Sequence, residues 1–315
     1  MMSLSQGPRT ASRPIRIVEV GPRDGLQHEP DTVSTEAKVA FVNALSQTGV
    51  AEIEAGSFVS ARAIPQLADS DEVFRKITRI PGIVYSALVP NERGLERARA
   101  AAADKIAVFT AASDEFTRRN INCTIRESTE RFRPIVYGAK RDGMIVRGYI
   151  STATHCPFGG PVPPSQVLEV MCRLFDLGVD EISLGDTVGK AAPRDVRKLL
   201  DEIVPRMKRL RLSLHFHDTC GMAVANVLTA WTEYGIEVFD TAAGGLGGCP
   251  YAPGASGNVA TEDVVYALKA SGAVLAVDER KVIEAAGEIG KVLNRPLSSR
   301  LSRVQAEQTA YEGMV

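Results

Sequence analysis

Short runs of apolar residues recur along this chain at similar intervals, and each run is bounded by polar or turn-forming residues. Runs of this length that are rich in Val, Ile and Leu are typical of buried strands. The pattern predicts strands at residues 15–20, 51–55, 82–89, 105–109, 144–150, 180–184, 211–217 and 237–242.

Between these runs lie segments in which apolar residues return every three or four positions, the spacing of an amphipathic helix. Several of them open with Ser, Thr or Pro and close near Gly, which are common signals for the start and end of a helix. The pattern predicts helices at residues 35–47, 94–103, 165–177, 193–204 and 223–234.

A regular alternation of strands and helices predicts an α/β protein, specifically a (β/α)8 TIM barrel with additional C-terminal helices. A doubly wound open sheet is the alternative, but residues 20–25 (VGPRDG) lack the glycine spacing of a dinucleotide fingerprint. We expect a disordered tail at 1–14, one barrel domain at 15–305 with a C-terminal helical extension, and a polar tail at 306–315.

Composition narrows the class of partner. The 37 basic and 38 acidic side chains nearly cancel, which argues against a nucleic-acid partner or an anionic membrane surface. No apolar run approaches the roughly 20 residues of a membrane span. The 5 cysteines are an odd number spread through a long chain, which favours a reducing, cytoplasmic location without a disulfide framework. Of these, Cys123, Cys172 and Cys220 are expected to be buried apolar side chains.

The predicted strand at 211–217 carries the strongest chemical signal. Successive side chains of a strand alternate between its faces, so Leu214 and Phe216 share one face while His215 and His217 share the other. Two neighbouring imidazoles that point into one cavity can hold a divalent cation. An ordinary pair of core histidines is the alternative explanation for this tripeptide taken alone.

In a (β/α)8 barrel, chemistry takes place where the strands end. Most of the unusual polar residues lie at the ends of predicted strands or in the loops after them: Arg23, Asp24 and Gln27, then Glu54, Asp186, His215, His217, Cys249 and Asn258. Simpler explanations exist for several of them. Asp186 could cap the next helix, Arg23 and Asp24 could form a surface ion pair, and the glycines around Cys249 could be a flexible tether.

Four motifs together resemble the 3-hydroxy-3-methylglutaryl-CoA lyase (HMG-CoA lyase) family. They are VEVGPRDGLQ at 18–27, SLGDT at 183–187, HFHDT at 215–219, and GLGGCPY at 245–251 with GASGN at 254–258. The resemblance spans about residues 15–305. The cysteine-containing loop is its most specific part, because related condensing synthases and aldolases share the other motifs but not this one.

The resemblance implies a set of site residues. By matching motifs, the metal ligands are Asp24, His215, His217 and Asn258, and the cation is Mg²⁺ or Mn²⁺ rather than Zn²⁺. The catalytic group then comprises Arg23, Glu54, Asp186, His215 and Cys249. Arg23, Gln27 and Asn120 are expected to contact an acyl-CoA substrate.

The implied reaction is a retro-Claisen cleavage to acetyl-CoA and a keto acid. The metal lowers the pKa of the substrate's tertiary hydroxyl, Arg23 stabilises the developing negative charge, and Cys249 protonates the enolate or closes the site. Glu54 and Asp186 both remain candidates for proton transfer. A homo-oligomer, either a dimer or a tetramer, is also expected.

Two departures from the family bear on the substrate. Ala61-Arg62-Ala63 replaces a common Pro-Lys-Trp, and His155 stands where a smaller residue is usual. Both are expected at the rim, so the acyl substituent need not be methyl. Competing functions are a related acyl-CoA lyase, a condensing synthase or aldolase on the same barrel, which Leu26 and the Cys249 loop disfavour, and a non-catalytic binding protein.

Overall fold

Eight parallel strands close into a barrel in this computed structural model, which describes residues 14–206, 211–248 and 257–312. Around the ring the strands follow the order β1-β10-β9-β8-β5-β4-β3-β2, so consecutive barrel strands are neighbours and the last closes on the first. The barrel strands are β1 (Arg16–Glu19), β2 (Glu52–Ser57), β3 (Val84–Leu88), β4 (Lys105–Ala111), β5 (Ile145–Ser151), β8 (Glu181–Asp186), β9 (Arg211–Phe216) and β10 (Val238–Thr241). The predicted fold class and all eight predicted strands are confirmed.

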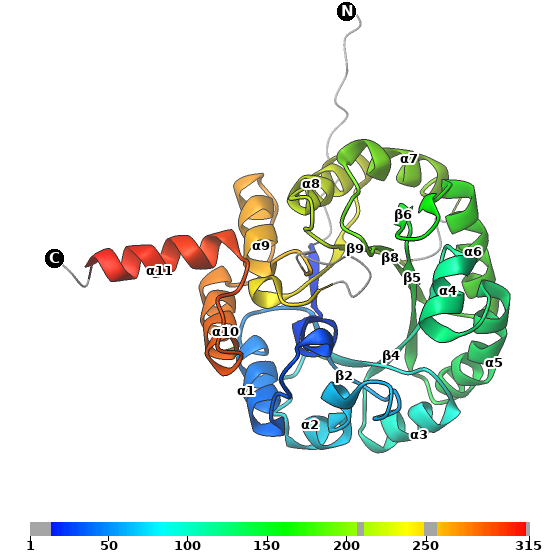
Figure 1. Ribbon diagram of the computed structural model, residues 1–315, viewed down its shortest axis with the longest axis horizontal. Helices are drawn as coiled ribbons and strands as arrows, with labels where there is room; N and C mark the ends of the chain where they lie inside the picture. Colours follow the sequence, from blue (N-terminus) through cyan, green and yellow to red (C-terminus); the bar gives the residue numbers. More distant parts are fainter. Residues whose placement is uncertain (1–13, 207–210, 249–256, 313–315) are drawn as a thin grey trace, which may run out of the picture.

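Helices surround the barrel, as Figure 1 shows. They are α1 (Thr35–Leu45), α2 (Ser70–Lys76), α3 (Glu92–Ala100), α4 (Asp114–Ile121), α5 (Ile125–Arg141), α6 (Pro164–Leu177), α7 (Pro193–Ile203), α8 (Ala223–Tyr234), α9 (Thr261–Ala270), α10 (Glu279–Val292) and α11 (Arg300–Glu312). Short elements complete the described chain: the π-helix η1 (Gly21–Gly25), the 3-10 turns η2 (Leu26–His28), η3 (Pro65–Leu67) and η4 (Ala243–Gly245), and a hairpin of β6 (His155–Cys156) with β7 (Gly160–Pro161).

Local sequence explains several helix ends. The Ser34 side chain accepts a hydrogen bond from Ala37 N at the start of α1, and Thr124 forms a capping box with Glu127 at the start of α5. Gly178 ends α6 with φ 95°, a left-handed conformation that glycine adopts without strain. The caps of α1 and α6 are signals of the kind from which helices at 35–47 and 165–177 are predicted, whereas α5 is not among the predicted helices.

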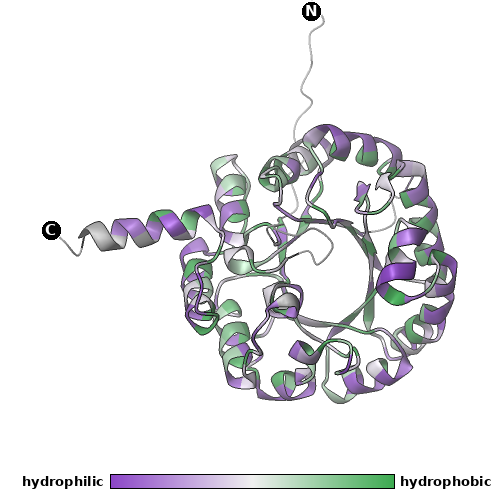
Figure 2. Cartoon of the chain, in the orientation of Figure 1, coloured by the Kyte–Doolittle hydropathy of each residue, from purple (hydrophilic) through white to green (hydrophobic). Residues whose placement is uncertain are grey.

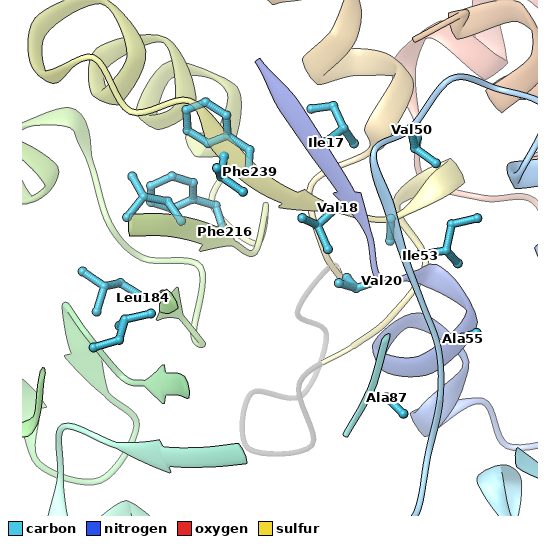
Figure 3. Packing of buried hydrophobic residues seen from close by; sticks show 14 of the residues in the cluster. Ile17, Val18, Val20, Val50, Ile53, Ala55, Ala87, Leu184, Phe216 and Phe239 are labelled. Atoms are coloured by element: carbon cyan, nitrogen blue, oxygen red, sulfur yellow. The ribbon is translucent and has the colours of Figure 1, made fainter. Parts of the chain in front are cut away.

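The hydrophobic core lies between the barrel and its helices. Ile17, Ile53 and Phe239 are fully buried and point away from the barrel axis (Figure 3). The surrounding helices alternate hydrophilic and hydrophobic residues (Figure 2), as expected for elements with one buried face. Among the described helices, none combines the length and the apolarity needed to cross a bilayer.

The structure corrects some expectations from sequence. Cys172 and Cys220 are exposed, whereas Cys123 is buried as predicted. On α6 the buried positions are Val167, Val170, Met171 and Leu174, so Cys172 lies on the outer face of that helix. The C-terminal helix α11 projects away from the barrel (Figure 1) and continues to Glu312, beyond the boundary expected at residue 305.

Candidate active site

A cavity of about 560 Å³ opens at the end of the barrel where the strands terminate. In a parallel barrel this is the end at which loops from different strands converge. Of the side chains predicted from sequence, six line the cavity: Arg23, Asp24, Gln27, Asn120, His215 and His217. The structure thus brings together residues that are far apart in the sequence.

Asp24, His215 and His217 form a cluster in which the three candidate ligand atoms lie within 4.8 Å of one another. His215 Nε2 is 4.0 Å from Asp24 Oδ2. The two histidines face the cavity because Leu214 and Phe216, on the opposite face of β9, are buried in the hydrophobic core. One carboxylate and two imidazoles at this spacing are a suitable donor set for a divalent cation.

The π-helix η1 brings Asp24 to the cluster. The N–H groups of Arg23, Asp24 and Gly25 all donate to Val20 O, at 3.2, 2.8 and 3.1 Å. This tight turn at the end of β1 places Arg23 and Asp24, which are adjacent in sequence, together on the wall of the cavity. π-Helical turns are rare in proteins overall, but those that occur are often found at functional sites.

Asn258 lies beside the cluster because the backbone holds it there. It pairs with His217 in an antiparallel bridge, and Val259 N donates to Phe216 O at 3.0 Å. The Asn258 amide donates to Asp24 Oδ2 at 3.0 Å. Its Oδ1 is buried and accepts no hydrogen bond from any residue that the structure describes. A buried acceptor without a donor is costly, and a cation at the cluster would satisfy it.

Arg23 is buried next to this cluster and is held by two carboxylates. Its Nε donates to Glu54 Oε2 at 2.6 Å, and its Nη1 lies 2.5 Å from Asp24 Oδ1. Burial alone would lower the pKa of Arg23, but the charges of Glu54 and Asp24 raise it overall. Burial raises the pKa of Glu54 despite the opposing effect of Arg23. The pKa of Asp24 shifts in the opposite direction. Burial would raise this pKa, but Arg23 and the two histidines hold it well below the usual range.

Sequence reasoning missed two residues of this region, Tyr149 and Asp240. Tyr149 lines the cavity, with the Arg23 guanidinium 5.5 Å from the centre of its ring. Asp240 lies on β10, where it is 1% exposed, and its Oδ2 is 3.4 Å from His215 Nδ1. An acidic residue inside a short buried strand was the available signal for Asp240, because such a carboxylate must have partners.

Two predicted catalytic residues do not line the cavity. Glu54 lies beneath it, in contact with Arg23 and with Tyr149, whose hydroxyl is 3.4 Å from Glu54 Oε2. Asp186 accepts hydrogen bonds from Thr154 Oγ1 at 2.8 Å and from Ala191 N at 2.9 Å. Asp186 therefore anchors the loop after β8 by these hydrogen bonds. The adjacent residues Gly185 and Thr187 line the cavity. A further predicted catalytic residue, Cys249, lies outside the described residues.

Only one of the two unusual rim segments reaches the cavity. Ala63 and Ile64 line it, together with the apolar side chains Val59, Leu88 and Phe109. His155 belongs to the β6–β7 hairpin and is not among the cavity residues. The mouth therefore has a polar side, formed by the loops after β1 and β9, and an apolar side formed by the loop after β2 and by β3 and β4.

Comparisons with known proteins find relatives along most of the chain. A family model described as HMGL-like matches residues 14–289. The chain is 49% identical over 289 residues to the protein named 3-hydroxy-3-methylglutaryl-CoA lyase, cytoplasmic, of Rattus norvegicus, which covers 92% of this chain and 84% of the relative.

Solved structures give the same result. A hydroxymethylglutaryl-CoA lyase from Pseudomonas aeruginosa superposes with a TM-score of 0.91 at 44% identity, over 94% of this chain and 99% of the other. An HMG-CoA lyase from Acinetobacter baumannii, in complex with coenzyme A and 3-methylmalate, superposes with a TM-score of 0.84 at 39% identity, over 92% and 94% of the two chains.

Proposed function

Because the chain belongs to the HMGL-like family, we propose that it cleaves 3-hydroxy-3-methylglutaryl-CoA, or a close 3-hydroxy-3-substituted analogue, to acetyl-CoA and a keto acid. The protein is an enzyme of the carbon–carbon lyase class, as are the relatives that it matches over most of its length. The observation that carries the proposal is the cluster of Asp24, His215 and His217 at the barrel mouth, tied to Asn258 by a hydrogen bond.

These four residues would hold the cation. Two oxygen donors and two imidazole nitrogens leave coordination positions for substrate and water, which favours Mg²⁺ or Mn²⁺. When bound, the cation supplies a positive charge that lowers the pKa of the substrate's tertiary hydroxyl and so favours loss of its proton. Asn258 Oδ1 supports this arrangement, because a donor is missing there among the described residues.

Arg23 is the chain's own cationic group at the cavity. Cleavage of the C2–C3 bond develops negative charge on the thioester oxygen of the departing acetyl unit, and a fixed guanidinium stabilises it without reorganisation. Glu54 acts on Arg23 rather than on substrate, since it contacts the guanidinium from beneath the cavity. Cys249 remains our proposal for the proton donor to the enolate, on the basis of the sequence motif.

The remaining cavity residues suit a long thioester. Gln27 lies on η2, directly after η1, and Asn120 is an exposed residue of α4; both line the cavity. The apolar side chains that line the same cavity offer a surface for the acyl-CoA arm, and a structural relative was solved in complex with coenzyme A. We assign Gln27 to the acyl group and Asn120 to the coenzyme portion.

The direct test is to incubate purified protein with Mg²⁺ or Mn²⁺ and 3-hydroxy-3-methylglutaryl-CoA and to measure acetyl-CoA and acetoacetate. We expect both products in equal amounts, with formation stopped by EDTA and restored by excess metal. A condensing synthase would instead consume acetyl-CoA, and a binding protein would leave the thioester intact. Product formation that persists in EDTA would contradict the metal dependence.

A larger acyl substituent is a second candidate, favoured by Ala63 and Ile64 on the cavity wall. A small side chain at 63 leaves space next to Val59 on the apolar side of the mouth. Parallel assays with 3-hydroxy-3-alkylglutaryl-CoA thioesters of increasing alkyl length would compare kcat/KM across the series. A maximum at an alkyl group longer than methyl would assign that substrate.

We also propose a cytoplasmic location and a homo-oligomeric state. The first is supported by relatives that are named as cytoplasmic lyases. The second, a dimer or a tetramer, is to be checked by light scattering of the purified protein. A monomeric mass at micromolar concentration would contradict it.

A further inference from the structure

Asp240 lies at the centre of a hydrogen-bond network that crosses the barrel interior. It is 1% exposed and receives donors from three other strands. Ser183 Oγ of β8 donates to Oδ2 at 2.7 Å, Ser213 Oγ of β9 donates to Oδ1 at 2.9 Å, and Arg147 Nη1 of β5 donates to Oδ1 at 2.7 Å. These contacts fix the carboxylate in one orientation.

One position around the carboxylate remains, and His215 faces it. A carboxylate offers about four lone-pair directions, and the three donors above occupy three of them. His215 Nδ1 lies 3.4 Å from Oδ2. Nδ1 is buried and completes no well-aligned hydrogen bond with any described residue, and Asp240 is the carboxylate placed to accept its proton. The ring thus presents Nδ1 to Asp240 and Nε2 to Asp24.

The two ring nitrogens of a histidine are linked, because a neutral imidazole carries one proton. A carboxylate at Nδ1 favours the proton there, which leaves the Nε2 lone pair directed at the cation site. We propose that Asp240 is a positioning residue for the metal centre: it fixes the tautomer and ring orientation of His215. This inference rests on the metal site of the proposed function.

A purely structural role is the competing explanation, since Asp240 also forms an ion pair with Arg147. Glu181 provides a matched control for it. Its Oε1 accepts from Arg147 Nε, and it also pairs with Lys105 at 2.8 Å, but it does not contact His215. Glu181→Gln therefore disturbs Arg147 to a similar degree without altering the environment of His215.

The test compares Mn²⁺ affinity in the parent, Asp240→Asn and Glu181→Gln, measured on metal-free protein from the electron paramagnetic resonance signal of unbound Mn²⁺. Loss of such a histidine partner typically weakens metal binding about 10–100-fold. We expect that loss for Asp240→Asn and about a twofold change or less for Glu181→Gln. Equal affinities in parent and Asp240→Asn would overturn the inference, as would an equal loss in both variants.

The second readout is the histidine tautomer, observed by ¹⁵N NMR of the metal-free parent. The chain has only 4 histidines, so His215→Ala assigns the relevant signal. We expect the proton of His215 on Nδ1 in the parent and on Nε2 in Asp240→Asn, whose amide would donate to Nδ1. A proton on Nε2 in the parent would overturn the inference even if the variant did not fold. Failure of the parent to bind Mn²⁺ would instead overturn the proposed metal dependence.

Discussion

Two groups of buried charged residues lie inside the same barrel, and they differ in charge balance. The mouth cluster is Arg23, Asp24, Glu54, His215 and His217, and the lower cluster is Glu52, Lys105, Arg147, Glu181 and Asp240. Both combine acidic and basic side chains, most of them less than one-tenth exposed, but histidines occur only in the mouth cluster and a lysine only in the lower cluster.

In the lower cluster each charge has an opposite charge beside it. Lys105 Nζ lies 2.8 Å from both Glu52 Oε2 and Glu181 Oε1, and Arg147 joins Glu181 to Asp240. Arg211, at the start of β9, approaches Glu181 Oε2 at 3.8 Å and brings the cations to the same number as the anions. The charges of this network are therefore balanced, although Arg147 Nη2 is buried without an acceptor among the described residues.

In the mouth cluster one guanidinium faces two carboxylates, and two imidazoles add lone pairs. Glu54 Oε1 and Asn258 Oδ1 are buried without a hydrogen-bond donor among the described residues. An excess of negative charge and unused acceptors is costly in a folded protein unless a cation completes it. Charge balance and the pair of imidazoles, rather than burial, separate the candidate site from the scaffold below it.

The substitution His215→Ala is the most direct test of this difference between the two clusters. We expect the variant to lose metal-supported cleavage by about a thousandfold or more, which corresponds to about 4 kcal/mol of activation free energy. Its unfolding free energy should change little, because Asp240 keeps Arg147 and two hydroxyl donors. Steady-state kinetics and urea unfolding measure the two effects. Parental activity in the variant would remove the metal assignment.

The reverse experiment removes a cation from the lower cluster. Lys105→Met leaves Glu52 buried without its ammonium partner, and breaking a buried ion pair typically costs about 3–5 kcal/mol of unfolding free energy. We expect kcat of the folded fraction to stay within about twofold, since Lys105 does not line the cavity. Changing Glu52→Leu in the same molecule should recover part of the stability. A loss of kcat without a loss of stability would contradict the distinction between the clusters.

The fold was predictable because its signals are local. Each strand is a short apolar run, and in a barrel all the strand ends meet at one rim, so residues at the ends of five different strands could be grouped without knowing any contact. The alternation that placed His215 and His217 also indicates that Leu184 and Asp186 share a face of β8. The alternation therefore predicts that Asp186 points outward like Phe216, its partner in register on β9.

The contacts of Asp240 were not predictable in the same way. Its partner Arg147 is 93 residues away in the sequence and lies on a strand that is not its neighbour in the ring. Such pairings depend on how side chains cross the barrel interior, which strand periodicity does not specify. The bulge in β2 after Glu54, which affects how that side chain sits beneath Arg23, is likewise a tertiary feature.

Glu19 is a buried carboxyl that belongs to neither cluster, and its hydrogen-bond donors are all uncharged. It accepts from Gly21 N at 2.8 Å, Ala243 N at 3.0 Å and Thr261 Oγ1 at 2.6 Å. Burial raises its pKa from 4.5 to about 7, against the lowering effect of these hydrogen bonds. The folded chain then holds a proton that the unfolded chain has released between pH 4.5 and 7, so the unfolding free energy falls as the pH rises through this range.

We expect this group to contribute a decrease of about 3 kcal/mol over that range, at about 1.4 kcal/mol for each unit of pKa shift. Urea unfolding of the parent and of Glu19→Gln at a series of pH values measures it. The variant should show a smaller decrease, because its amide does not titrate. Identical pH profiles would mean that Glu19 is ionised throughout, and that uncharged donors suffice to hold a buried carboxylate.

The smallest expected effect concerns the apolar side of the mouth. Ala63 and Val59 both line the cavity and belong to the loop after β2. Ala63→Trp would fill that side without touching Asp24 or His215, so Mn²⁺ affinity should stay at the parental value. If the space receives an alkyl substituent, kcat/KM for a long-chain 3-hydroxy-3-alkylglutaryl-CoA should fall about 10–100-fold relative to the methyl compound, since contacts of this kind are worth about 1–3 kcal/mol.

Ala63→Ser is the matched control, because it changes polarity with little change in volume. Equal losses for the methyl and long-chain thioesters would show that the apolar side holds the coenzyme arm that both substrates share.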